Sequence, residues 1–168
     1  AISAASQINE DVHVLVLGSN SDSVAKSISE CPSVKKVIHI NNELYKNYLA
    51  ENYSSAVIKI SDSYSHIICS ANTFGKNLMP RIAALLDVSQ VSDITKVISE
   101  DTFIRPIYAG NAFATVKSND KIKCVTIRPT SFDPAPSSGG SAEIKNGEPG
   151  DVIELSKFIK KEEIKSDR

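Results

Sequence analysis

Short apolar runs alternate with amphipathic segments over the first half of the chain. The apolar runs cover His13–Gly18, Val34–Ile40 and His66–Ser70. The first is almost continuously apolar and ends in glycine, which is typical of a strand buried on both faces of a sheet. Strands that alternate with helices pair in parallel. The pattern therefore predicts a layered α/β fold with a mostly parallel sheet.

Apolar positions three and four residues apart predict the helices between these strands. The longest such pattern runs from Leu44 to Tyr64, as one helix or as two pieces. A shorter one follows the possible caps at Ser21–Ser23. We also expect the second half of a helix over residues 1–8. A last helix is expected over Gly75–Leu86, with three side chains facing inward: Leu78, Ile82 and Leu85.

The pattern changes after residue 100, where three β-rich runs follow one another closely. They cover Thr102–Tyr108, Phe113–Lys117 and Lys121–Arg128. The breaks, Gly110-Asn111 and 118–120, have turn composition, so the runs predict an antiparallel meander. Pro106 removes a backbone donor, which favours an edge strand or a bulge.

Proline, glycine and serine dominate residues 133–150, which predicts a flexible, exposed loop. Residues 151–168 hold a short apolar cluster and then a charged tail, whose pattern does not separate strand from helix. A length of 168 residues fits one domain.

The charge balance and the cysteines exclude several classes of protein. A net charge of −1 disfavours a nucleic-acid partner. No apolar run approaches the ~20 residues of a membrane span, and we expect neither membrane insertion nor a secretory signal. The three cysteines are widely spaced and form no C-x-x-C pair, which argues against disulfides and a metal site. Cys69 and Cys124 lie in predicted strands, where a buried, inert thiol in a reducing compartment is expected.

Two turns between a strand and a helix are candidate phosphate sites. Gly18–Ser21 has one glycine where a dinucleotide fingerprint needs three, so a tight connection with helix caps is favoured. In Ser70–Lys76, Asn72 or Thr73 caps the next helix, and Gly75 and Lys76 are the candidate cofactor-binding residues, for phosphate. The turn lacks the upstream glycine of a P-loop, so capping is favoured here too.

Other polar residues have structural interpretations. The three histidines lie in or beside strands without a metal-ligand partner, and we identify no catalytic residues. Gly110-Asn111 suits positive φ in a turn. Arg105 is the residue that we expect to face a partner.

The stretch Ser70–Lys117 carries more specific motifs. A helix that opens with glycine precedes a loop with Ser92-Asp93-Ile94, and a β-segment then ends in Ile107–Ala112. Further motifs follow at Thr130–Asp133, Ser138–Ser141 and Lys165–Arg168. Together they resemble the N-terminal domain of the alpha subunit of electron transfer flavoprotein, over most of the chain.

The resemblance implies a fold and a function. The fold is a three-layer Rossmann-like α/β domain of the adenine-nucleotide-alpha-hydrolase-like type, spanning residues 1–168. Its role is a scaffold without catalytic residues that packs against the beta subunit of a heterodimer. The holoprotein carries electrons from acyl-CoA dehydrogenases of fatty acid beta-oxidation to a quinone reductase. It resides in the mitochondrial matrix in eukaryotes and in the cytoplasm in bacteria.

Two parts of the family pattern are missing from this sequence. The C-terminal domain that binds FAD in the full-length protein is absent, so we expect no FAD on these residues alone. A central strand before the segment that starts at Ile2 is absent as well. Its two neighbours would then keep unpaired backbone groups, each costing ~1–3 kcal/mol if buried. We expect an N-terminal extension or another copy of the chain in that slot.

A second function stays open at the level of sequence. A stand-alone nucleotide-binding domain of the universal-stress-protein type would use the Ser70–Lys76 turn for phosphate.

Overall fold

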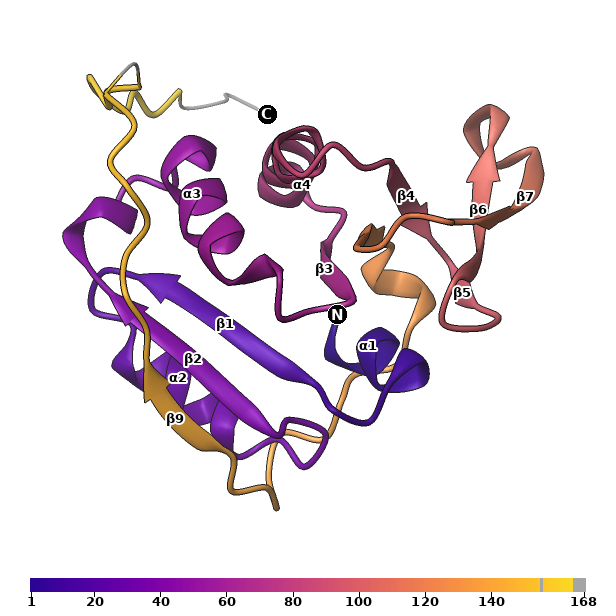
Figure 1. The fold of residues 1–168 in the computed structure, drawn as a ribbon, viewed down its shortest axis with the longest axis horizontal. Helices are drawn as coiled ribbons and strands as arrows, with labels where there is room; N and C mark the ends of the chain where they lie inside the picture. The colour runs from indigo at the N-terminus through magenta and orange to yellow at the C-terminus, as the bar shows by residue number, and fades with distance from the viewer. Residues whose placement is uncertain (155, 165–168) are drawn as a thin grey trace.

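Two parallel sheets of three strands each form the centre of the molecule (Figure 1). The structure is a computed structural model, and it describes residues 1–154 and 156–164. The first sheet has the order β1-β2-β9 and the second β3-β8-β4. Their bounds are β1 His13–Gly18, β2 Lys36–Asn41, β3 His66–Ser70, β4 Gln90–Ile94, β8 Lys123–Ile127 and β9 Glu143–Asn146.

In the part of the chain that the structure describes, four α-helices cover the two sheets on opposite faces, as their buried side chains show. They are α1 Ile2–Ile8, α2 Asp22–Ser29, α3 Ala50–Ser61 and α4 Thr73–Leu85. Apolar side chains of α3 and α4 pack on Leu15 and Leu17 of β1 and on Ile67 and Cys69 of β3. Neighbouring residues of these strands face the opposite side of each sheet. Val14 and Val16 of β1 pack against α2, and Ile68 of β3 packs in one cluster with α1. This arrangement confirms the predicted layered α/β fold.

A third, antiparallel sheet projects from the second one as an arm (Figure 1). It consists of β5 Lys96–Val97, β6 Thr102–Ile107 and β7 Ala112–Lys117. The turn η2 Tyr108–Gly110 closes the β6–β7 hairpin. Pro106 pairs with Phe113 of β7, while the short β5 reaches only Phe103 and Ile104 of β6. β6 is the central strand of the arm and not an edge strand, but the side of Pro106 away from β7 is not paired with β5, so the missing backbone donor of proline is tolerated there.

The arm ends one strand earlier than the predicted meander. β8, expected as its third strand, is instead the centre of the second parallel sheet, between β3 and β4. Four of its five residues are buried, because it is covered on both faces. Alternation alone does not distinguish a third meander strand from a strand that returns to a distant parallel sheet, so this prediction was wrong.

Two strands lie where loops were expected. Ser92-Asp93-Ile94 belongs to β4, whose pairing with β8 shifts register between Val91 and Ile94. β9 lies in the predicted loop 133–150 and pairs in parallel with β2. All four of its side chains are exposed, so its sequence carries no apolar signal and only backbone hydrogen bonds define it.

Smaller differences concern helices. The Leu44–Tyr64 pattern forms two pieces, the 3₁₀ turn η1 Glu43–Tyr45 and α3. Leu78 and Ile82 of α4 are buried as predicted, but Leu85 is 54% exposed at the end of the helix. Leu155, one member of the apolar cluster predicted after residue 151, lies outside the described residues, as does the motif Lys165–Arg168.

A cavity separates the two parallel sheets. Within the described chain, β1 pairs only with β2 and β3 pairs only with β8. A cavity of about 560 Å³ lies between them, lined by residues 13–17 of β1 and 66–69 of β3. The β1 strand was predicted to be buried on both faces, yet five of its six residues are only half-buried, as are all five of β3. These strands are half-exposed because they border the cavity.

Candidate functional site

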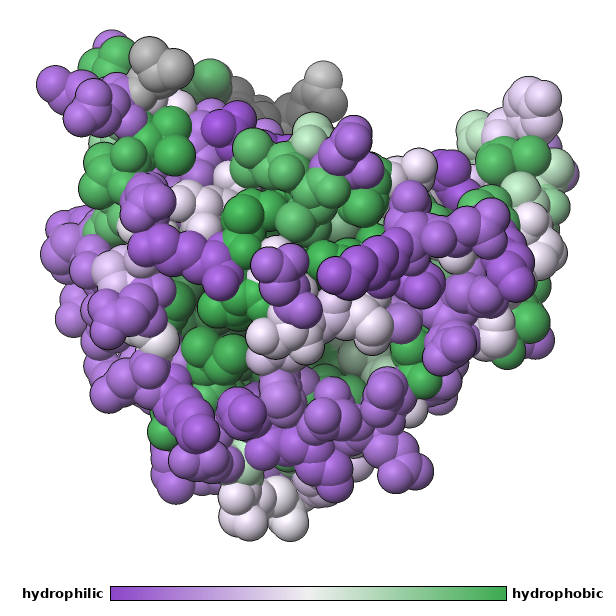
Figure 2. Space-filling model, in the orientation of Figure 1, coloured by the Kyte–Doolittle hydropathy of each residue, from purple (hydrophilic) through white to green (hydrophobic). Residues whose placement is uncertain are grey.

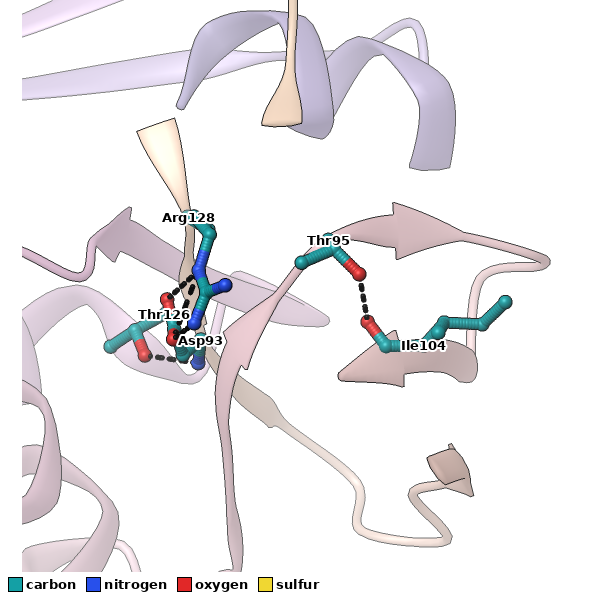
Figure 3. Close-up of polar contacts among 5 residues, drawn as sticks. All are labelled: Asp93, Thr95, Ile104, Thr126 and Arg128. Carbon is teal, nitrogen blue, oxygen red and sulfur yellow. Dashed lines mark hydrogen bonds and ion pairs between the residues drawn. The ribbon is translucent and has the colours of Figure 1, made fainter. Parts of the chain in front are cut away.

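The root of the arm contains an ion pair on a strained backbone (Figure 3). Asp93 lies at the β4 bulge with φ of 57°, which few residues other than glycine adopt. Its N–H donates to Oγ1 of Thr126 on β8, at 2.9 Å. Its carboxylate accepts two hydrogen bonds from Nε of Arg128, at 3.2 and 3.3 Å, and a shorter one from Nη2. The short polar side chain of aspartate is among those that tolerate this conformation best.

Arg128 comes directly after β8 and makes this contact across 35 residues of sequence. Hydrogen bonding to Asp93 raises the pKa of the Arg128 guanidinium further above its already high ordinary value, so this group keeps its positive charge. The backbone N–H of Arg128 also donates to Ile94 O, at 2.9 Å. Sequence reasoning singled out the Asp93 motif but not Arg128, because no local signal indicates a partner so distant in sequence.

Thr95 connects this root to the arm. Its backbone N–H donates to Ile104 O of β6 at 2.8 Å, and its hydroxyl donates to the same oxygen at 3.3 Å (Figure 3). Directly beside it, Ile94 and Phe103 are fully buried in one apolar cluster with Ile127 of β8. The arm is therefore attached to the parallel sheet by both packing and hydrogen bonds, which holds its direction.

A polar cluster at Asp101 secures the base of the hairpin. The carboxylate accepts hydrogen bonds from Thr102 at 2.7 Å and Ser99 at 2.9 Å, and pairs with Lys117 Nζ at 3.0 Å. These interactions lower the pKa of Asp101 to about 2, with the Thr102 hydroxyl contributing most. The carboxylate is thus ionised over the physiological range and joins both ends of the hairpin.

The tip of the arm exposes aromatic side chains on an unusual turn. Tyr108 is 79% exposed, and Phe113 of β7 is 66% exposed. Figure 2 shows apolar side chains gathered on the projecting arm. Tyr108, Ala109 and Gly110 all have positive φ, at 49°, 55° and 94°. The prediction of positive φ is confirmed for Gly110 but wrong for Asn111, whose φ is −72°. Arg105, the residue expected to face a partner, lies within β6, three residues before the turn at Tyr108. Its Nε is buried without a hydrogen-bond partner among the described atoms.

The predicted phosphate residues Gly75 and Lys76 lie at the start of α4, where the geometry has a structural explanation. Asn72, one of the two predicted caps, caps the helix by accepting from the Gly75 N–H at 2.8 Å. A Cβ on Gly75 would lie 1.9 Å from Ser70 O and 2.9 Å from Cys69 Sγ. Glycine is therefore required for the close approach of α4 to β3. Lys76 is exposed and makes no ion pair within the described chain.

The other candidate turn, after β1, is surrounded by acidic groups. Ser19 donates to Glu43, and Asn41 donates to Asp22 at 2.9 Å. The Ser21 side chain does not cap α2; its hydroxyl instead shares a hydrogen bond of 2.9 Å with Nε2 of His39. Carboxylates at this turn repel a phosphate, so it is a connection rather than an anion site.

The thiols and the remaining histidines occupy structural positions. Burial raises the pKa of Cys69 and of Cys124 to about 11, which disfavours the reactive thiolate. His13 Nδ1 lies 2.9 Å from the Tyr64 hydroxyl, and His66 Nε2 contacts Glu100 O at 2.6 Å. Among the residues that the structure describes, His, Cys, Asp and Glu side chains form no group of three that could hold a metal ion. None of the described helices is long and apolar enough to cross a membrane.

Comparison with known proteins defines the class of this protein. The family model described as "Electron transfer flavoprotein domain" matches residues 1–153. The chain belongs to the electron transfer flavoprotein family, which confirms the resemblance seen in its motifs.

Three curated relatives that the chain resembles are alpha subunits. The chain is 45% identical over 168 residues to the electron transfer flavoprotein subunit alpha of Pseudomonas aeruginosa, covering 99% of this chain and 54% of the relative. It is also 45% identical to the mitochondrial alpha subunit of Dictyostelium discoideum, covering 98% and 48%. A probable mitochondrial alpha subunit of Caenorhabditis elegans is 40% identical, with 100% and 51% covered. The chain thus spans about half the length of these relatives and matches their N-terminal part.

Proposed function

We propose that residues 1–168 are the N-terminal scaffold and subunit-interface domain of an electron transfer flavoprotein alpha subunit. The observation that carries this proposal is the family match over residues 1–153. The domain has no catalytic residues of its own in this proposal, and serves as a platform for the rest of the protein. The projecting arm supports it, since a rigidly attached hairpin with exposed aromatic side chains is typical of a contact surface.

The holoprotein in this proposal carries FAD on a C-terminal domain and pairs with a beta subunit. It passes electrons from acyl-CoA-type dehydrogenases to a quinone reductase, in the mitochondrial matrix if the source is eukaryotic and in the cytoplasm if it is bacterial. The names of relatives support the flavoprotein character and, for the eukaryotic ones, the compartment. The Gly75 and Lys76 turn is not needed as a phosphate site, because packing explains the glycine.

Co-expression with a beta subunit from a bacterial relative tests the proposal. We expect a stable complex of the chain with beta, and no visible flavin absorbance from the chain purified alone. Replacement of Phe113 by aspartate puts a charge in the centre of the exposed arm surface and is expected to weaken the complex at least tenfold, or about 1.4 kcal/mol. Size-exclusion chromatography with absorbance detection measures both results.

The matched control is Val24→Asp, which places the same charge on another half-exposed apolar residue, on α2. It should leave the complex intact. Failure of the unaltered chain to bind beta would contradict the scaffold role, and a yellow chain would place the flavin site within these residues.

A further inference from the structure

Asn146 is the last residue of β9, and Gly147 follows it, which makes the one Asn-Gly pair in the sequence. β9 forms the outer edge of the first sheet and, within the described chain, pairs only with β2 (Figure 1). All four of its side chains are exposed, that of Asn146 included. The carboxamide of Asn146 is therefore open to water, and its glycine neighbour offers no side chain that would hinder attack on it.

Asparagine before glycine is prone to an intramolecular reaction, in which the backbone nitrogen of the glycine attacks the Cγ of the asparagine. The new N–Cγ bond closes a succinimide ring. The bond from Cγ to Nδ2 breaks, and ammonia leaves with the proton that the backbone nitrogen gives up. Water from the solvent then adds to one of the two ring carbonyls and opens the ring. One product is aspartate, and the other is isoaspartate, whose main chain runs through Cβ.

Pairing with β2 holds the attacking nitrogen in an unreactive position. The Gly147 N–H donates to His39 O of β2 at 2.9 Å, so its proton is engaged. Asn146 is the register partner of His39, which keeps its backbone extended. Ring closure requires a rotation about ψ of Asn146 that brings the Gly147 nitrogen to Cγ. The reaction therefore requires the end of β9 to separate from β2.

Backbone contacts, rather than buried side chains, hold β9 in place. Before the strand, the Gly140 N–H donates to Glu30 O at 2.7 Å. After it, the Gly150 N–H donates to the Tyr45 hydroxyl at 2.9 Å. Segments with few buried apolar contacts open locally at a low cost in free energy. Because β9 buries none of its four side chains, it opens between these two anchors more readily than the covered strands β2 and β8.

We propose that Asn146 is a site of spontaneous deamidation and that local opening of β9 controls its rate. The isoaspartate product adds one carbon to the main chain before Gly147, so the Gly147 N–H loses its register with His39 O. Both products place a new negative charge beside Glu148. The modification thus weakens the pairing of β9 with β2 irreversibly. The inference does not depend on the proposed function.

Peptide mapping by mass spectrometry of the full chain, aged at mildly alkaline pH, locates the modification. The reference is a synthetic peptide of residues 141–151, whose backbone is free to rotate. Deamidation should concentrate at Asn146 in both samples. It should be at least about tenfold slower in the folded chain, because only the open fraction of β9 reacts. Electron-based fragmentation distinguishes isoaspartate from aspartate.

A variant outside the reactive pair tests control by opening. A Cβ on Gly140 would lie 2.5 Å from Cys31 O, so Gly140→Ala loosens the anchor before β9. It should speed hydrogen exchange of the Gly147 N–H and deamidation of Asn146 by the same factor, about threefold or more. Leu85→Ala, at the exposed end of α4, is the matched control and should change neither rate. Asn146→Gln keeps an amide but lengthens the side chain beyond succinimide closure, and should abolish the reaction.

Urea below the unfolding transition provides the same test without a substitution, since it favours local opening, and circular dichroism establishes whether Gly140→Ala is folded. Equal deamidation rates in the folded chain and the peptide would overturn control by opening. Faster exchange at Gly147 without faster deamidation would do the same. A peptide that stays unmodified at Asn146, or a chain that reacts chiefly at another asparagine, would show that the site is wrong.

Discussion

At the scale of single residues, the root of the arm depends on one strained aspartate and its arginine partner. Asp93 adopts a left-handed conformation that costs an ordinary residue about 1 kcal/mol. It is compensated by the Thr126 hydroxyl and by three hydrogen bonds from Arg128. The Asp93 and Arg128 side chains are 28% and 40% exposed, so solvent screens the pair only in part.

Arg128→Ala is expected to lower the free energy of unfolding by about 1 kcal/mol, because the half-exposed pair is lost and Asp93 keeps its strained backbone. Asp93→Asn should lower the free energy of unfolding by a similar amount, because it removes the carboxylate charge opposite Arg128. The loss is not larger, because asparagine also tolerates the left-handed conformation. Urea denaturation of both single variants and the double variant gives their coupling energy, expected at about 0.5–1 kcal/mol. The control Lys145→Ala removes an exposed pair with Glu143 at 3.9 Å and should have almost no effect. A coupling energy near zero would show that the pair contributes nothing.

At the scale of elements, the contact between α4 and β3 explains the glycine that the sequence offered as a phosphate residue. The first turn of α4 approaches the end of β3 so closely that no side chain fits at Gly75. Asn72 satisfies the N-terminal N–H that a bound anion would otherwise use. The element contact, and not a ligand, determines the residue at this position.

Gly75→Ala should destabilise the fold by about 1–3 kcal/mol, because the new Cβ overlaps a backbone oxygen that cannot move without shifting β3. The neighbouring exposed Lys76→Ala is the control and should change stability by less than about 0.5 kcal/mol. Thermal and urea unfolding measure both. An alanine variant as stable as the parent chain would mean that the close approach is not the reason for glycine, and would return the ligand interpretation to Gly75.

At the scale of the whole molecule, α3 and α4 connect the two half-sheets. Their buried side chains share one cluster with Ile40 of β2 in the first sheet and Cys124 of β8 in the second. Since β1 and β3 are not paired with each other in the described chain, side-chain packing is the principal connection across the cavity. We therefore expect the stability of both sheets to depend on this cluster.

Met79→Ala tests this dependence, because Met79 is fully buried in the shared cluster and also lines the cavity. It should cost about 2–4 kcal/mol, while unfolding remains a single transition. Leu85→Ala is the control in the same helix, where the side chain is 54% exposed, and should cost less than about 1 kcal/mol. Urea unfolding followed by circular dichroism and by tyrosine fluorescence measures the effect. Two separate transitions in the Met79 variant would show that the half-sheets fold independently.

The sequence by itself determined the elements whose signals are local. Short segments rich in apolar residues predicted β1, β2 and β3, and three-and-four spacing predicted the helices, because burial in a layered fold imposes these patterns. Residue type and position indicated a helix cap at Asn72 or Thr73, and the structure shows that Asn72 is the cap. The motifs from Ser70 to Asp133 identified the family, which the comparisons confirm.

Only the tertiary structure decided how distant segments pair. β8 resembles a third meander strand in its own composition, yet it lies between β3 and β4, since burial on both faces outweighs the proximity of β7 in sequence. β9 forms through backbone hydrogen bonds to β2 that its exposed side chains do not encode. The Asp93–Arg128 pair and the cavity between β1 and β3 likewise arise from long-range packing, whose energies depend on neighbours that no local pattern specifies.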